Sequence, residues 1–344
     1  MGLWIQMNIF RKPVLFWDAE EKKWKVTDLP RGANPVYRDS LISYVNAFGP
    51  LFEKAKNICE FEFILTLLRV KGLDSPGWDP FENTQQVFKC ISKLEKKISD
   101  FYAIRHLFLW LYGHIVEASE PYEILANLIN VCEGGRFHVN NFPNKVGGKY
   151  RIPQSPSEKI DKLEEMASKI DMCNCVFPLK DVFDRDLRNA IFHSDYSLYE
   201  GEVRIRKPRK LYSHDEIMEI MNKGLAYFNA FVSIFNAYVR SYDEPKVIGV
   251  HKDFGGHPNE EAVTIIRKGH GLAGIKDNWT REELKRGHIP FRIGRFSRYE
   301  TKLLKENRLL ATLPASRTER INKILRILPK FISKRIAKRL RAKF

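Results

Sequence analysis

The sequence predicts a mainly α-helical protein, with a short β-hairpin before the helices and a small α/β appendage after them. Apolar residues recur at three- and four-residue steps through at least four long segments, the pattern of helices that bury one face. The chain has 344 residues and 44% hydrophobic content, enough for a sizeable core. We divide it into an N-terminal extension at 1–34, a helical bundle at 35–244, an appendage at 245–300 and a tail at 301–344.

The first part of the chain combines a strand-like pattern with a long helical one. Two short aromatic and β-branched runs, at 13–17 and 24–26, flank a polar stretch and predict a hairpin. From Tyr37 an apolar stripe continues to Leu68. The Gly49-Pro50 pair predicts a break within it, because proline removes a backbone donor. The glycine- and proline-containing stretch that follows, 72–80, is expected to form a loop.

The middle of the chain continues the helical pattern. Helices are predicted at 84–118 and 121–132, the second beginning with a proline and ending before two glycines. Residues 137–156 are rich in Gly, Asn and Pro and are expected to form a long loop. Ser157 is a candidate cap for the next helix, and Pro178 is expected to open the helix that carries the motif described below.

The pattern changes again after the motif. Residues 196–210 interrupt the helical periodicity, with a turn predicted at 199–202 and a strand-like run at 203–206. Ser213 and Glu216 then form a capping-box pattern, which predicts the start of another long helix.

The appendage reads as a mixture of short strands and one helix. Strands are predicted at 246–250, 262–267 and 291–293. A short helix is predicted at 280–285, with Thr280 as its cap.

The formal charge of +16 lies mostly in the tail. Residues 317–344 hold eleven Lys or Arg and one acidic residue, so they carry +10 of the total. Apolar residues recur there at three- or four-residue steps, which predicts a basic amphipathic helix. Such a helix could lie on an anionic membrane surface, bind RNA, or dock on a partner protein or on the body of the chain. The net charge alone therefore selects no partner.

Cysteine usage and hydropathy suggest a cytoplasmic protein. The five cysteines lack the paired spacing of a zinc site and are expected to be reduced thiols. Residues 1–10 lack the cationic start and apolar run of a secretion signal. The apolar stretches at 107–116 and 225–239 are shorter than a membrane span needs. The histidines of the appendage have no recognisable ligand spacing, so no metal or other cofactor is predicted.

One short segment, 187–196, carries residues suited to chemistry on RNA. It places Arg188, Asn189 and His193 within one and a half helical turns. A guanidinium is always charged and can bind two phosphate oxygens at once. Histidine side chains ordinarily have a pKa of about 6.5, so they can exchange protons under physiological conditions. Because RNA carries its own nucleophile, the 2′-hydroxyl, such groups could cleave it without a metal.

This segment resembles the Arg-x4-His signature of the HEPN superfamily of helical-bundle ribonucleases and nucleotide-binding domains, in which a polar residue, often Asn, follows the arginine. Arg188, Asn189 and His193 match that pattern, and the resemblance extends over about residues 35–244. It implies a HEPN-like bundle and a metal-independent endoribonuclease with a role in bacterial stress or phage defence. Some toxin-type members carry a tyrosine two residues after the histidine, whereas Tyr196 lies three after His193.

The spacing of the motif sets a geometric condition. Five helical steps place Arg188 and His193 roughly 140° apart around a regular helix. Either the helix ends near Phe192, so that His193 turns back, or a partner completes the site. Family members often pair two motifs across a dimer, so the resemblance implies a homodimer. Asp195 could orient the imidazole or cap the helix end.

A basic run follows the motif. Cations for phosphates and aromatic rings for bases are what single-stranded RNA binding uses. The predicted RNA-binding residues are Arg204, Arg206, Lys207, Arg209, Lys210 and Tyr196. A solvated strand edge kept soluble by charge would show the same pattern.

A structural interpretation of the motif also stays open. Arg188, Asn189 and His193 could satisfy helix-end carbonyls and a neighbouring carboxylate such as Asp184 or Asp186. The chain would then be a non-catalytic helical protein that binds RNA or a partner through its basic tail.

Overall fold

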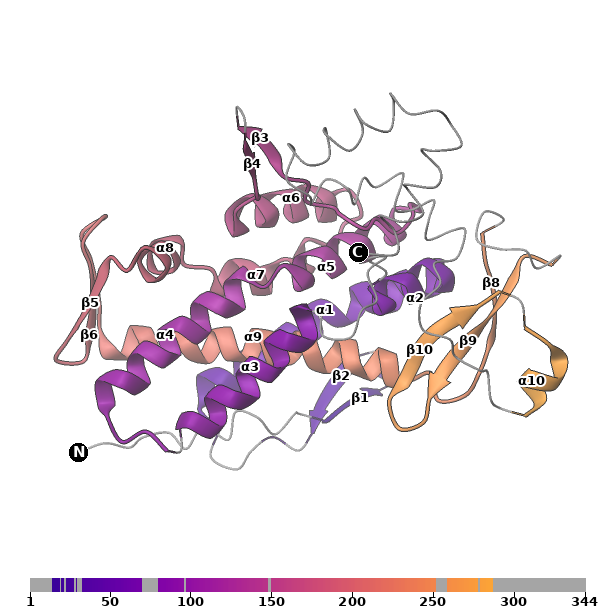
Figure 1. Ribbon diagram of the computed structural model, residues 1–344, viewed down its shortest axis with the longest axis horizontal. Helices are drawn as coiled ribbons and strands as arrows, with labels where there is room; N and C mark the ends of the chain where they lie inside the picture. Colours follow the sequence, from indigo (N-terminus) through magenta and orange to yellow (C-terminus); the bar gives the residue numbers. More distant parts are fainter. Residues whose placement is uncertain are drawn as a thin grey trace, which may run out of the picture.

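A computed structural model describes residues 14–18, 20–21, 23–27, 29, 33–69, 80–95, 97–147, 150–251, 259–277 and 279–286. Its architecture is mainly α-helical with small antiparallel sheets, as the sequence predicts (Figure 1). The long helix α9 runs along the longest axis of the molecule. One three-stranded sheet lies at one end of α9 and the other lies at the opposite end (Figure 1).

The helices, in chain order, are α1 (Pro35–Ile58), α2 (Glu60–Leu68), α3 (Pro80–Glu95), α4 (Phe101–Glu117), α5 (Ser119–Cys132), α6 (Pro156–Ser168), α7 (Phe177–Val182), α8 (Arg185–His193), α9 (His214–Arg240) and α10 (Arg281–Lys285). The strands are β1 (Val14–Asp18), β2 (Lys23–Thr27), β3 (Lys145–Gly147), β4 (Tyr150–Ile152), β5 (Tyr196–Tyr199), β6 (Glu202–Ile205), β7 (Lys210–Tyr212), β8 (Val247–Gly249), β9 (Glu261–Arg267) and β10 (Gly271–Lys276). They pair as β1-β2, β3-β4, β5-β6-β7 and β10-β9-β8.

The main core forms where α1 packs along α9. Phe48 and Phe231 meet edge to face with ring centroids 5.5 Å apart, and Phe52 stacks on Tyr238 at 5.3 Å. Both phenylalanines of α1 are fully buried. Burying each such ring contributes about 1.5–3 kcal/mol, and the ring pairs add to this. The Tyr238 hydroxyl donates to Glu53 at 2.8 Å, so its polar end is satisfied at the edge of the core.

The predicted break at Gly49-Pro50 is wrong. Helix α1 continues through Pro50 and ends at Ile58. Pro50 lies on the exposed side of the helix, while the residues around it pack against α9. Tertiary burial on one face therefore outweighs the loss of one backbone hydrogen bond. Gly49 has a separate role, because the Trp24 ring of β2 lies directly against it.

Two other boundaries differ from the prediction. The helical run expected at 84–118 is divided into two helices, α3 and α4. Asp100 caps the start of α4, because its carboxylate accepts the Ala103 N–H at 2.7 Å. The loop expected at 137–156 contains the β3-β4 hairpin. Ser155, not Ser157, caps α6, and it forms a capping box with Glu158.

The predicted hairpin, the Ser213 capping box and the Thr280 cap are all present. The strands predicted near 246–250 and 262–267 correspond to β8 and β9. Strand β10 was not predicted, because its glycines weaken the strand pattern. Gly271 at its start has φ +83°, and a Cβ there would lie 2.2 Å from the Val239 carbonyl oxygen.

Several predictions fall outside the described residues: the strand at 291–293, the basic tail at 317–344 and the loop at 72–80. Of that loop only Pro80 is described, and it begins α3. Across the described part of the chain, every helix is too short or too polar to cross a membrane.

Replacing Gly49 by alanine should destabilise the fold, because the new Cβ would lie 2.5 Å from Cδ1 of Trp24. Overpacking of this kind costs about 1–3 kcal/mol. Gly224→Ala in α9 is a matched control, since its Cβ would meet nothing closer than 3.4 Å. That variant should be neutral or stabilised by up to about 1 kcal/mol through helix propensity. Thermal unfolding followed by circular dichroism checks both, and equal effects in the two variants would contradict the packing described.

Candidate functional site

The motif lies on its own short helix. Pro178 opens α7, not the motif helix as predicted, and the chain turns at Phe183 before α8 begins. Asp184 caps α8: one of its carboxylate oxygens accepts the N–H groups of Asp186 and Leu187 at 2.9 and 3.0 Å. The cap satisfies donors that the first turn of a helix leaves free.

Asp184 also connects α8 to three other elements. Its second carboxylate oxygen accepts the Tyr212 hydroxyl at 2.8 Å and lies 3.3 Å from the Lys210 ammonium, both from β7. Its backbone N–H donates to the Tyr112 hydroxyl of α4 at 2.8 Å, and that hydroxyl donates to the Val182 carbonyl at the end of α7 at 2.9 Å. Burial raises the pKa of Asp184, but the Leu187 N–H, Tyr212 and Lys210 together outweigh it and hold the pKa below its ordinary value.

The inner face of α8 packs on α4 and β6. Leu187, Ala190 and Ile191 are buried in a second apolar cluster, separate from the main core, that includes residues of both elements. At 100° per residue, Arg188 and His193 fall on the two flanks of the opposite, outward face. The outward face itself carries Arg185, Asn189 and Phe192. The two motif side chains therefore border one exposed surface.

Arg188 is held in a fixed position. Its Nε and Nη2 both donate to one carboxylate oxygen of Glu117, the last residue of α4. Nη1 donates to the Asn189 side chain at 2.8 Å, and the guanidinium carbon lies 5.1 Å from the centre of the Phe192 ring. These contacts use three of the five N–H groups of a guanidinium, so two remain for a ligand. The carboxylate that binds Arg188 is thus Glu117, and neither Asp184 nor Asp186.

His193 is the last residue of α8, one later than the predicted end. Ser194 follows it in the left-handed conformation, with φ +54°, and the Asp195 N–H closes the helix on the Ala190 carbonyl at 2.9 Å. The imidazole is exposed and makes no hydrogen bond to any described residue. Asp195 thus acts on the helix end through its backbone, and its side chain is not seen to orient the imidazole.

The predicted RNA-binding cations divide into two groups on the β5-β6-β7 sheet. Arg204 is bound by Glu202 at 2.8 Å and stacks on Tyr199 at 4.3 Å from the ring centre, and Lys210 pairs with Asp184. The other three lie exposed at the turn between β6 and β7, without an ion pair to a described residue: Arg206, Lys207 and Arg209. Only this second group is fully available to an anionic ligand.

Tyr196 has a different environment from the one expected for a base-stacking residue. It is half-buried against the second apolar cluster, and its hydroxyl lies 2.8 Å from Nδ1 of His106 on α4. Burial raises its pKa, and a side-chain hydrogen bond with Trp110 opposes that shift. Its predicted role in RNA binding stays a prediction, and Tyr199 is the more exposed ring on this sheet.

Glu117 was not among the predicted site residues. A local pattern could not find it, because Glu117 and Arg188 are 71 positions apart. One signal was present: an acidic residue at the C-terminal end of a helix opposes the helix dipole. A cation from elsewhere in the fold, paired with Glu117, would offset this unfavourable position.

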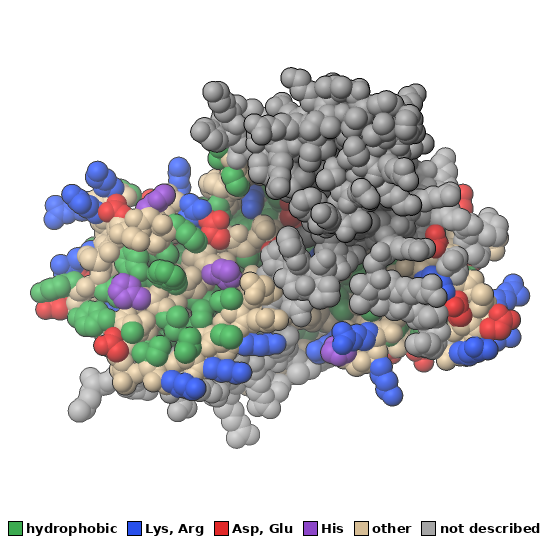
Figure 2. All heavy atoms as spheres, viewed as in Figure 1, with side chains coloured by type: hydrophobic (Ala, Val, Ile, Leu, Met, Phe, Trp, Pro, Cys, Tyr) green, Lys and Arg blue, Asp and Glu red, His purple; other side chains and the backbone are tan. Residues whose placement is uncertain are grey.

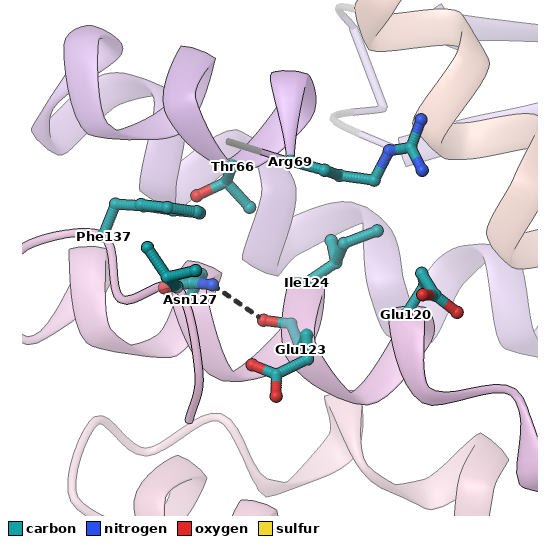
Figure 3. A pocket seen from close by; sticks show the side chains of 8 residues that line it. Thr66, Arg69, Glu120, Glu123, Ile124, Asn127 and Phe137 are labelled. Atoms are coloured by element: carbon teal, nitrogen blue, oxygen red, sulfur yellow. Dashed lines mark hydrogen bonds between the residues drawn. The ribbon is translucent and has the colours of Figure 1, made fainter. Parts of the chain in front are cut away.

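A small pocket lies elsewhere, where the end of α2 faces α5 (Figure 3). Figure 3 shows Thr66 and Arg69 on one side and Glu120, Glu123 and Asn127 on the other. The Asn127 amide donates to the Glu123 carbonyl at 3.1 Å. The space amounts to about 20 Å³, room for about one water molecule. None of the predicted site residues lines it. The described residues also contain no group of three or more His, Cys, Asp or Glu side chains placed to hold a metal ion.

Asp184→Asn should lower the stability of the protein at neutral pH by about 1 kcal/mol, because the Lys210 pair is lost while an acceptor for the cap remains. Since the folded-state pKa lies below the ordinary 3.8, the stability from Asp184 is fully present above that value. It is lost as pH falls through the folded-state pKa. Melting temperatures from about pH 6 to pH 3 should therefore converge for variant and wild type. Asp186→Asn, which removes only a 3.4 Å contact to Lys210, should have a smaller effect; a constant gap at all pH values would contradict the assignment.

Comparison of the chain with family models, with curated proteins and with solved structures finds no match.

Proposed function

We propose that this chain is a metal-independent endoribonuclease of the HEPN type. The observation that carries the proposal is the outward face of α8, where a fixed guanidinium with two N–H groups to spare and an exposed imidazole flank the same surface. Arg206, Lys207 and Arg209 add exposed cations on the adjoining sheet. The resemblance of the motif implies the same activity, with a cytoplasmic role in bacterial stress or phage defence.

The residues can be given defined roles in RNA cleavage. An imidazole takes the proton of the 2′-hydroxyl as the 2′-oxygen bonds to phosphorus. The bond from phosphorus to the 5′-oxygen breaks, and that oxygen receives a proton from a second acid. The products are a 2′,3′-cyclic phosphate and a 5′-hydroxyl. Arg188 stabilises the charge that develops on the non-bridging oxygens, and Asn189 holds Arg188.

A homodimer would supply the second proton-transfer group. Within one chain, Arg188 and His193 are roughly 140° apart around α8 and the motif has a single imidazole. Two α8 helices meeting by their outward faces would bring two imidazoles and two guanidiniums to one cleft. One imidazole could then act as base and the other as acid. A two-fold axis makes such an interface self-complementary.

A second candidate function is non-catalytic RNA or partner binding. The observation in its favour is the Glu117–Arg188 ion pair, which ties α8 to α4 and would serve the fold even without chemistry. Both side chains are only partly exposed, at 22% for Arg188 and 30% for Glu117. Under this alternative the motif is structural, and binding depends on the basic residues.

Arg188→Ala and His193→Ala should each abolish RNA cleavage in EDTA. Loss of a positioned proton-transfer group or charge-stabilising donor costs about 10²–10⁴-fold in rate. The double variant should be little worse than either single one, because both groups serve one transition state. Cleavage of a labelled RNA, measured beside melting temperature, checks this.

Arg281→Ala is the matched control, since Arg281 is an exposed arginine on α10, at the opposite end of the molecule from α8 (Figure 1). It should cleave RNA at close to the wild-type rate. His193→Ala should remain folded, because its imidazole makes no described hydrogen bond. A folded His193→Ala protein that cleaves like wild type would exclude the proposed active site. A large loss of stability in Arg188→Ala, with no cleavage by the wild type, would favour the structural alternative.

Deleting residues 317–344 should weaken nonspecific binding to RNA or to anionic vesicles, because this segment carries +10 of the net charge. The dependence of binding on salt should also flatten, since fewer counterions are released. Anisotropy and vesicle co-sedimentation at several salt concentrations measure both. A variant with Arg206, Lys207 and Arg209 changed to Gln retains the tail and separates the two basic regions. Unchanged binding of the truncated protein at low salt would refute the role of the tail.

A further inference from the structure

The surface beside the motif is aromatic. Figure 2 shows hydrophobic side chains gathered over the part of this face where α4 lies, with histidines among them. Two large rings there are strongly exposed: Trp110 of α4 at 66% and Phe192 of α8 at 51%. Tryptophan is normally well buried, so an indole this open signals a surface that meets a ligand.

Trp110 lies beside a polar contact between α4 and β5. Its side chain is near that of Tyr196 at the start of β5, and the Tyr196 hydroxyl lies 2.8 Å from Nδ1 of His106, one turn earlier on α4. Trp110 is nevertheless 66% exposed, so most of the indole stays open to solvent.

Trp110 and the motif belong to one continuous surface. Gly113 lies three residues after Trp110 on α4, on the same side of the helix, and is buried there. The Phe192 ring lies against it, so that a Cβ at Gly113 would be 3.2 Å from the ring. The Arg188 guanidinium packs over the same Phe192 ring. Along this surface the Arg188 cation is followed by the Phe192 ring, which covers Gly113, and then by the Trp110 ring.

We infer that Trp110 is a stacking platform for an unpaired nucleobase of single-stranded RNA, next to the phosphate bound at Arg188. An indole face stacks on any base, but only when the base is not already stacked and paired within a duplex. The exposed cations Arg206, Lys207 and Arg209 complement the phosphates of such a strand. The inference rests on the proposed function in taking RNA as the ligand, and it names single-stranded RNA as the class that the site binds.

A second copy of the chain is the other occupant that an exposed indole could meet. The two predict different responses to substitution. Stacking on a base needs an aromatic ring, so Trp110→Phe should retain most of the binding whereas Trp110→Leu should not. A protein contact needs apolar area, which leucine supplies about as well as phenylalanine.

The experiment measures binding by fluorescence anisotropy in a His193→Ala background, so that RNA stays intact. The probes are a labelled single-stranded oligoribonucleotide and the same strand annealed to its complement. Trp110→Ala and Trp110→Leu should weaken single-strand binding about 5- to 100-fold, with duplex binding nearly unchanged and Trp110→Phe close to the parent. Phe177→Ala, which removes a ring 43% exposed on α7, is the matched control and should bind like the parent.

Light scattering and melting temperature are recorded for every variant. The inference is overturned if Trp110→Ala binds single strands like the parent, if Trp110→Leu binds as well as Trp110→Phe, or if Trp110→Ala turns dimers into monomers. Failure of the proposed function gives a separate result: the wild type does not cleave RNA, while the binding series still reports on Trp110.

Discussion

The position of the motif depends on one carboxylate. Asp184 caps α8, binds Tyr212 and Lys210 of β7, and is linked through the Tyr112 hydroxyl to α4 and α7. Four elements, α4, α7, α8 and β7, therefore meet at the residue that caps a nine-residue helix. An isolated helix of this length is unstable in water, so these contacts and the buried inner face hold it in place. The outward face stays accessible to a ligand because the inner face is buried and the cap is satisfied by other elements.

The sequence predicted what is encoded locally. The capping box at Ser213, the cap at Thr280, the N-terminal hairpin and the long apolar stripes all follow from patterns within a few residues, and each is present. The prediction failed at Gly49-Pro50, where packing against α9 overrides a local rule. It also placed the start of the motif helix at Pro178, because nothing local shows that Asp184 would be satisfied by β7 and α4.

The candidate site was predictable only in its chemistry. Arg188, Asn189 and His193 could be chosen from their spacing. The spacing did not predict that Glu117 of another helix binds the guanidinium. The same holds for Trp110, which appeared as one more apolar residue of a core helix. Its exposure follows from the arrangement of α4 relative to α8 and β5, and that arrangement depends on contacts between segments about 80 residues apart. Helix α4 thus contributes its inner side to packing and its outer side to the surface around the motif.

The Glu117–Arg188 pair has no net charge, and this bears on which phosphates the site would tolerate. A phosphodiester within an RNA strand carries one negative charge, whereas a terminal phosphate carries close to two at neutral pH. Each additional negative charge beside Glu117 costs roughly 1–3 kcal/mol at a partly exposed position. An unpaired arginine would attract the doubly charged group more strongly. With Glu117 in place, the site would bind the singly charged phosphate of an internal linkage more favourably, relative to a doubly charged phosphate. Chain ends and free phosphate would therefore compete weakly for the guanidinium.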